Sequence, residues 1–178
     1  MVSLLLADRR IDVNSQDEGC TPFFMSCQNG RKEVVVLPLA DPRIDVNQPD
    51  IDGVTPLLIA CELGHKEVVS LLLNDTRIDV NKPGMEQCSP LWEASQNGQL
   101  FFVQLMLASG RDIDTKTKSI AGPAYWKNKS AAEIGRCQAT RAKLSSESEG
   151  DHARKKQNGP LIAALLDSFD LDSPWSCR

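Results

Sequence analysis

The sequence predicts an all-α fold, a solenoid in which short helix-turn-helix units stack side by side. The chain has 178 residues, but an aromatic content of only 5 % leaves few large side chains for one globular core. One sequence pattern also returns at a fixed spacing, and in a stack of repeats each unit buries its apolar face only against its neighbours. We expect about four units and a partial half repeat at the N-terminus.

The clearest copy of this pattern runs from Asp52 to Leu73 and reads DGVTPLLIACELGHKEVVSLLL. It holds a turn, a short apolar first helix and a longer apolar second helix. Each first helix is predicted to start at a hydroxyl cap followed by proline, and the caps are Thr21, Thr55 and Ser89, 34 residues apart. Each first helix ends at a glycine that can adopt a left-handed conformation, and these are Gly30, Gly64 and Gly98.

The second helices carry apolar residues at helical spacing, which core packing explains. Small side chains in the first helices are expected to face the next repeat, at Cys27, Cys61 and Ser95. Pro38 interrupts the second helix that begins near Glu33, and a proline inside a helix costs about 3 kcal/mol. We therefore expect this helix to end early or kink near Leu37.

These copies resemble the ankyrin repeat family, whose TPLHLAA motif is matched best at residues 55–61. The resemblance covers residues 2–114 closely and the rest loosely. It implies a half repeat at 1–14 and repeats near 15–47, 48–81 and 82–114. Residues 115–172 then form an enlarged finger loop and a divergent capping repeat, with helices from Ser130 and Pro160 and a flexible charged insertion at 138–158. Residues 173–178 are a tail.

Charge and composition exclude several classes of function. Residues 1–114 hold nine Lys and Arg against seventeen Asp and Glu, and an acidic body argues against nucleic acid as a partner. The chain contains no apolar run of about 18 residues and no signal-peptide pattern, so we expect a cytoplasmic protein without a membrane partner. The six cysteines form no CxxC pair, which predicts reduced thiols rather than a zinc site.

No catalytic motif is evident, so we predict that the chain is not an enzyme and needs no cofactor or metal. His65 stands where the ankyrin family commonly has histidine, which implies a structural hydrogen bond. His152 has no partner at ligand spacing. The acidic turn residues are grouped once per repeat, about 10 Å apart, which is too far to share an ion. They form either a solvated ridge or a site for a basic partner.

The resemblance further implies a concave partner-binding surface, built by the finger tips and the exposed sides of the first helices. Its predicted members are Asp17, Glu18, Cys20, Gln28, Ile51, Asp52, Val54, Leu58, Glu62, Met85, Glu86, Cys88, Trp92 and Gln96. Three of them are large apolar residues at solvent-facing places, and burial against a neighbouring finger is the alternative for each: Ile51, Met85 and Trp92. Two aromatics of the enlarged loop either pack on the last repeats or contact a partner: Tyr125 and Trp126.

The predicted function is that of a protein-binding scaffold, monomeric, with a partner of unknown identity. One alternative is a regulatory or targeting part of a larger enzyme or channel, because the chain opens in the middle of a repeat. Another is small-molecule binding between Trp92, Tyr125 and Trp126.

Overall fold

A computed structural model describes residues 6–84, 87–117, 130–131, 133–134, 158–166 and 168. Within these ranges the regular secondary structure is helical, apart from an isolated bridge between Asp17 and Cys20, so the predicted all-α class is confirmed. The chain forms two compact units, Met1–Met85 and Glu86–Arg178, which are considered separately below.

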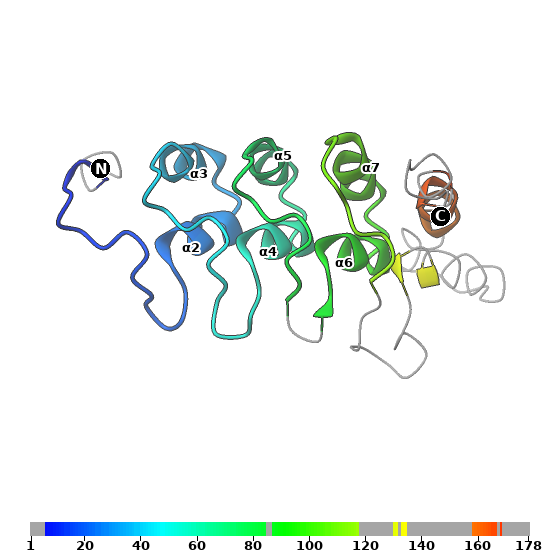
Figure 1. Ribbon diagram of the computed structural model, residues 1–178, viewed down its shortest axis with the longest axis horizontal. Coiled ribbons are helices and arrows are strands. Elements are labelled where there is room, and N and C mark those ends of the chain that lie inside the picture. Colours follow the sequence, from blue (N-terminus) through cyan, green and yellow to red (C-terminus); the bar gives the residue numbers. More distant parts are fainter. Residues whose placement is uncertain are drawn as a thin grey trace. The chain divides into compact units, whose positions relative to one another are not determined.

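The first unit contains two helix pairs, and the members of each pair pack on one another. Helix α2 (Pro22–Gln28) pairs with α3 (Lys32–Leu39), and α4 (Pro56–Glu62) pairs with α5 (Lys66–Asn74). Helix α2 also packs on α4, and α3 on α5, so the pairs stack in two rows. The turns that lead into α2 and α4 project as fingers, away from the row of α3 and α5 (Figure 1).

The predicted caps and stops of the first helices are confirmed. The hydroxyl oxygens of Thr21 and Thr55 accept the N–H groups of Phe24 and Leu58, at 3.1 and 3.2 Å. Ser89 accepts the N–H of Trp92 in the same way, at 3.2 Å. The three glycines that follow the helices have positive φ angles of 66°, 79° and 65°: Gly30, Gly64 and Gly98.

The core of the first unit lies between the two rows of helices. It is formed by apolar side chains from all four helices, chiefly Phe23, Cys27, Val35, Leu57, Cys61, Val68, Val69 and Leu72. The predicted small positions are fully buried in both units, since Cys27, Cys61 and Ser95 have no exposed surface. Burial raises the pKa of the Cys27 thiol to about 12, so this cysteine behaves as a small apolar residue.

The early end expected near Leu37 is not found, although helix α3 ends one residue before the position that matches the last residue of α5, Asn74. Helix α3 continues through Pro38 to Leu39, and Pro38 is buried. The proline lies in the last turn, where its missing N–H removes only one helical bond. The following residue, Ala40, closes the helix by donating its N–H to the carbonyls of Val36 and Leu37, at 3.3 and 3.2 Å.

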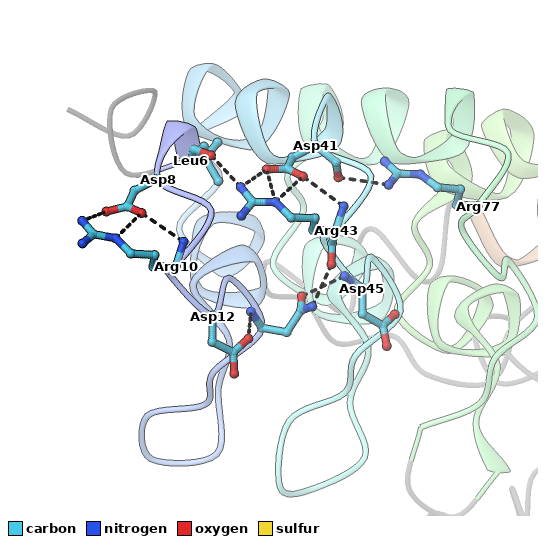
Figure 2. A network of polar contacts seen from close by, with 9 residues as sticks. Leu6, Asp8, Arg10, Asp12, Asp41, Arg43, Asp45 and Arg77 are labelled. Carbon is cyan, nitrogen blue, oxygen red and sulfur yellow. Dashed lines mark hydrogen bonds and ion pairs between the residues drawn. The ribbon is translucent and has the colours of Figure 1, made fainter.

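Hydrogen bonds from arginine and asparagine side chains join the repeats of the first unit (Figure 2). Arg43 is held by the Asp41 carboxylate at 2.6 Å and donates to the carbonyl of Leu6 in the preceding copy. Arg77 is held by Asp75 and donates to the carbonyl of Leu39 at 2.6 Å. The RIDVN strings therefore make contacts between repeats.

The asparagines of the same strings reach in the opposite direction. Asn14 donates to the carbonyl of Arg43 at 2.8 Å and accepts the N–H of Asp45 at 2.8 Å. Asn47 repeats both bonds one copy later, with the carbonyl of Arg77 and the N–H of Asp79. Each asparagine thus pairs with a donor and an acceptor of the next turn, which holds the bases of neighbouring fingers together.

The second unit contains the pair α6 (Pro90–Gln96) and α7 (Leu100–Ala108). The helix predicted from Ser130 is confirmed at its start. Ser130 donates its N–H to Glu133 at 2.8 Å and accepts the N–H of Glu133 at 3.4 Å, which is a capping box. Residues 158–166 are helical, so this helix includes two residues before the predicted start at Pro160. Most of the enlarged loop, nearly all of the charged insertion and the tail lie outside the described residues.

Candidate partner-binding surface

The first finger closes with a tight two-residue turn. Asp17 and Cys20 exchange backbone hydrogen bonds of 3.0 and 2.9 Å, and the two residues between them, Glu18 and Gly19, have φ angles of 50° and 82°. Two positive φ angles in succession are typical of a type I′ hairpin turn. The sequence contains the reason, because the segment from Asn14 to Thr21 is one residue shorter than its copy in the next repeat.

The second finger is held by an aspartate side chain. One carboxylate oxygen of Asp50 accepts the N–H groups of Asp52 and Val54, at 3.0 and 2.8 Å. Asp50 also pairs through its backbone with Val54 and Gly53. Asp50 is therefore a turn residue, and the side chains of Ile51 and Asp52 are exposed at the tip.

Ile51 is fixed against the first finger although most of its surface faces solvent. Its side chain lies so close to Gly19 that a Cβ atom on the glycine would stand 2.5 Å from Ile51 Cγ2. Gln16 adds a second link between the fingers by donating to the carbonyl of Pro49 at 3.0 Å. Ile51 nevertheless remains 79 % exposed. The predicted alternative, burial against a neighbouring finger, therefore applies to only one side of this residue.

Carboxylates from both fingers act on the Cys20 thiol. The pKa of the Cys20 thiol is raised by partial burial, and further by the carboxylates of Asp50, Glu18 and Asp52. No lysine or arginine occurs in residues 15–20 or 48–54, which form the two fingers. We use the name finger surface for the set Asp17, Glu18, Cys20, Ile51, Asp52 and Val54.

The predicted members on the first helices have different environments. Gln28 is half-buried, and its carbonyl accepts a hydrogen bond from the His65 Nε2–H group at 2.8 Å. This bond matches the structural role that the resemblance implied for His65. Glu62 is exposed on α4. Leu58 is buried and faces Gly84, so this residue serves packing rather than partner contact.

Trp92 is also a packing residue in this structure. It is only 2 % exposed and forms a small cluster with Ile134, against which the half-buried Cys88 packs. The alternative prediction, that Trp92 is buried, therefore holds. Part of the burial comes from Ile134 of a later helix and not from a neighbouring finger alone. Gln96 is half-buried, and four predicted members lie outside the described residues: Met85, Glu86, Tyr125 and Trp126.

On the first helices of the first unit and at their ends, the sequence reasoning missed two exposed apolar residues. Met25 on α2 is 42 % exposed, and Leu63 at the end of α4 is 50 % exposed. Leu63 aligns with asparagine in the other two copies, at Asn29 and Asn97. A comparison of each column of the repeat would have singled out Leu63, because an apolar side chain replaces two polar ones there.

The described residues offer no centre for metal chemistry. Among them, no three His, Cys, Asp or Glu side chains come together as ligands for one ion. The same part of the chain holds no helix long and apolar enough to span a membrane.

The stacked pairs of short helices, with fingers between them, define a helical repeat protein. Residues 37–117 match the family described as ankyrin repeats, three copies. The fold also resembles the crystal structure of EF0377, an ankyrin repeat protein, with a TM-score of 0.70 and 22 % identity over 93 % of this chain and 73 % of that one. No curated protein sequence gave a significant match. The chain therefore has the fold of an ankyrin repeat protein.

Proposed function

We propose that this chain is a protein-interaction module that holds its partner at the finger surface and the exposed sides of α2 and α4. The observation that carries the proposal is Ile51, a large apolar side chain that is 79 % exposed on a well-braced finger. Large apolar residues at such places mark interaction sites when they belong to a larger surface. Ankyrin repeats are in general protein-binding modules, which agrees with this reading.

The hydrogen bonds around the finger surface support binding, because they fix the conformation of the fingers before a partner binds. The first finger has a hairpin turn, the second is braced by Asp50, and Asn14 joins their bases. A surface that is already in its bound conformation loses less entropy on association. The module therefore binds without first folding its own contact residues.

We further propose that the protein performs no catalysis and works as a monomer in the cytoplasm, without nucleic acid or membrane as a partner. The acidic charge of the repeats argues against nucleic acid as a partner, and the free thiols of Cys20 and Cys27 support a reducing compartment. A regulatory role inside a larger enzyme or channel would use the same surface, and it stays a prediction.

The experiment that tests the proposed function places a photo-crosslinking amino acid at Ile51 in one variant and at Val36 in another. Val36 is 47 % exposed on α3, in the row of helices that lies away from the fingers (Figure 1). We expect a crosslinked protein in cells from position 51 and none from position 36. Ile51→Ser should then weaken binding of that protein, while Val36→Ser should not. Equal crosslinking from both positions would place the binding site elsewhere.

A further inference from the structure

We propose that the segment bound by the finger surface is basic, with lysine or arginine residues on both sides of an apolar side chain that packs on Ile51. This inference rests on the proposed function and adds the chemistry of the partner. It follows from the way in which the two fingers combine one exposed apolar side chain with carboxylates.

The apolar part of the surface is small and preformed. Ile51 lies against the backbone of Gly19, and the half-buried Cys20 and Val54 come from the two fingers. One apolar side chain of a partner can cover this area, whereas a large apolar partner would leave most of its own surface exposed. The surface therefore fits a single apolar anchor within an otherwise polar segment.

The charged side chains of the two fingers, residues 15–20 and 48–54, all have negative charge. Asp17, Glu18 and Asp52 are exposed at the finger tips, and Asp50 is half-buried in the second finger. Among the residues that the structure describes, none of these four carboxylates forms an ion pair. The two fingers lie close together, because the Ile51 side chain packs on Gly19 and Gln16 donates to the carbonyl of Pro49 at 3.0 Å.

Three other carboxylates of the same unit are paired with arginine within the fold. Asp8, Asp41 and Asp75 each hold an arginine at 2.6 to 2.7 Å. The carboxylates of the finger tips have no such arginine among the described residues, so they remain available to outside cations. Such a one-sign rim around an apolar centre attracts basic segments, speeds their association and repels acidic ones.

The test is a selection from a random linear peptide library displayed on phage, with the full chain as bait. Selected peptides are resynthesised, and their affinities are measured for the wild type and four variants. Ile51→Ser removes the anchor contact, and the pair E18Q/D52N removes two rim charges. The matched controls are Val36→Ser, at another exposed apolar residue, and E33Q/E67Q, which removes the same charge from the first turns of α3 and α5.

We expect the selected peptides to carry net positive charge around an apolar residue. Ile51→Ser should weaken their binding about tenfold. E18Q/D52N should weaken it about fivefold at low salt, and less as salt screens the charges. Both controls should stay within about twofold of the wild type. Circular dichroism should show the same helix content in all five proteins.

Each other outcome overturns a defined part of the argument. Peptides that depend on Ile51 but are neutral or acidic would overturn the basic partner and leave the proposed function standing. Peptides that ignore Ile51, or a library that yields none, would overturn both. An equal loss with E33Q/E67Q would show that net charge acts without regard to position, and the finger rim would then have no special role.

Discussion

The ring of His65 lies over Gly30 of the preceding repeat. Its Nε2–H group donates to the carbonyl of Gln28 at 2.8 Å, and a Cβ atom on Gly30 would stand 2.4 Å from Nδ1 of the ring. The glycine therefore serves two purposes, because its φ of +66° lets α2 end and its missing side chain leaves room for the imidazole. One helix stop thus also fixes how two repeats meet.

This relationship predicts unequal costs for two similar substitutions. Gly64→Ala meets no neighbour within 4 Å, so only its left-handed backbone should lower the free energy of unfolding, by about 1–2 kcal/mol. Gly30→Ala should cost about 1–3 kcal/mol more, because the methyl group displaces the His65 ring. Urea unfolding measures both.

The double variant Gly30→Ala/His65→Ala is the control. Its cost should be smaller than the sum of the two single costs, since removing the ring also removes the collision. Strict additivity would show that the ring does not restrict Gly30.

Asn47→Ala should destabilise the first unit. The side chain bridges two repeats, with the carbonyl of Arg77 at 2.7 Å and the N–H of Asp79 at 2.8 Å. Loss of both bonds should lower the free energy of unfolding by about 1–3 kcal/mol. Asn74→Ala, at the exposed end of α5, should change it by less than about 0.5 kcal/mol. If chemical denaturation shows similar losses of stability for Asn47→Ala and Asn74→Ala, the loss does not come from the bonds between repeats.

Gln87→Gly should stabilise the protein. Gln87 has a φ of 61° where the preceding repeat has Gly53, and a non-glycine residue in this region carries strain. Relief of the strain, less the added flexibility of glycine, should raise the free energy of unfolding by about 0.5–1 kcal/mol. Gln87→Ala keeps the Cβ atom and should show no gain. A shared increase in melting temperature would point to loss of the long side chain instead.

Acid should weaken the joint between Asp41 and Arg43. The hydrogen bonds from the Arg43 guanidinium lower the pKa of the Asp41 carboxyl from its ordinary 3.8. Because the folded pKa lies below the unfolded one, the stabilisation is complete above the unfolded value and is lost as pH falls through the folded value. Unfolding by urea, followed from about pH 5 to about pH 2, should therefore show a loss of stability in the wild type.

Two variants separate this carboxyl from the rest of the acid response. Asp41→Asn removes the titrating group, and Arg43→Gln removes the cation that lowers its pKa. Both should be less stable than the wild type near neutral pH and should lose less stability on acidification. Parallel pH profiles in all three proteins would refute the assignment.

The period of the sequence was enough to predict the helix pairs, the caps at Thr21, Thr55 and Ser89, and the glycine stops. These features are local, because each depends on residues within one turn of the chain. The effect of Pro38 was misjudged, since its cost depends on how many residues of the helix follow it. A proline in the last turn of a helix removes only one helical hydrogen bond.

The site was less predictable because exposure depends on partners distant in the sequence. Ile51 could be placed at a finger tip from its repeat position alone. Trp92 occupies a helix position that looked open, yet it is covered with the help of Ile134 from a later helix. Its neighbours along the chain give no sign of this cover. The contacts of Asn14 and Asn47 likewise join residues about one repeat apart, so the repeated string was visible but its role was not.

The joints between the repeats of the first unit have one more consequence. Arg43 and Arg77 donate to main-chain carbonyls of the copy before, and Asn14 and Asn47 bind main-chain groups of the copy after. The polar joint therefore places no demand on which side chains the neighbouring copy carries there. A duplicated or exchanged copy would carry its own arginine and asparagine for these bonds. Recombination can therefore lengthen or reorder such an array, while the residues at the finger tips change to bind new partners.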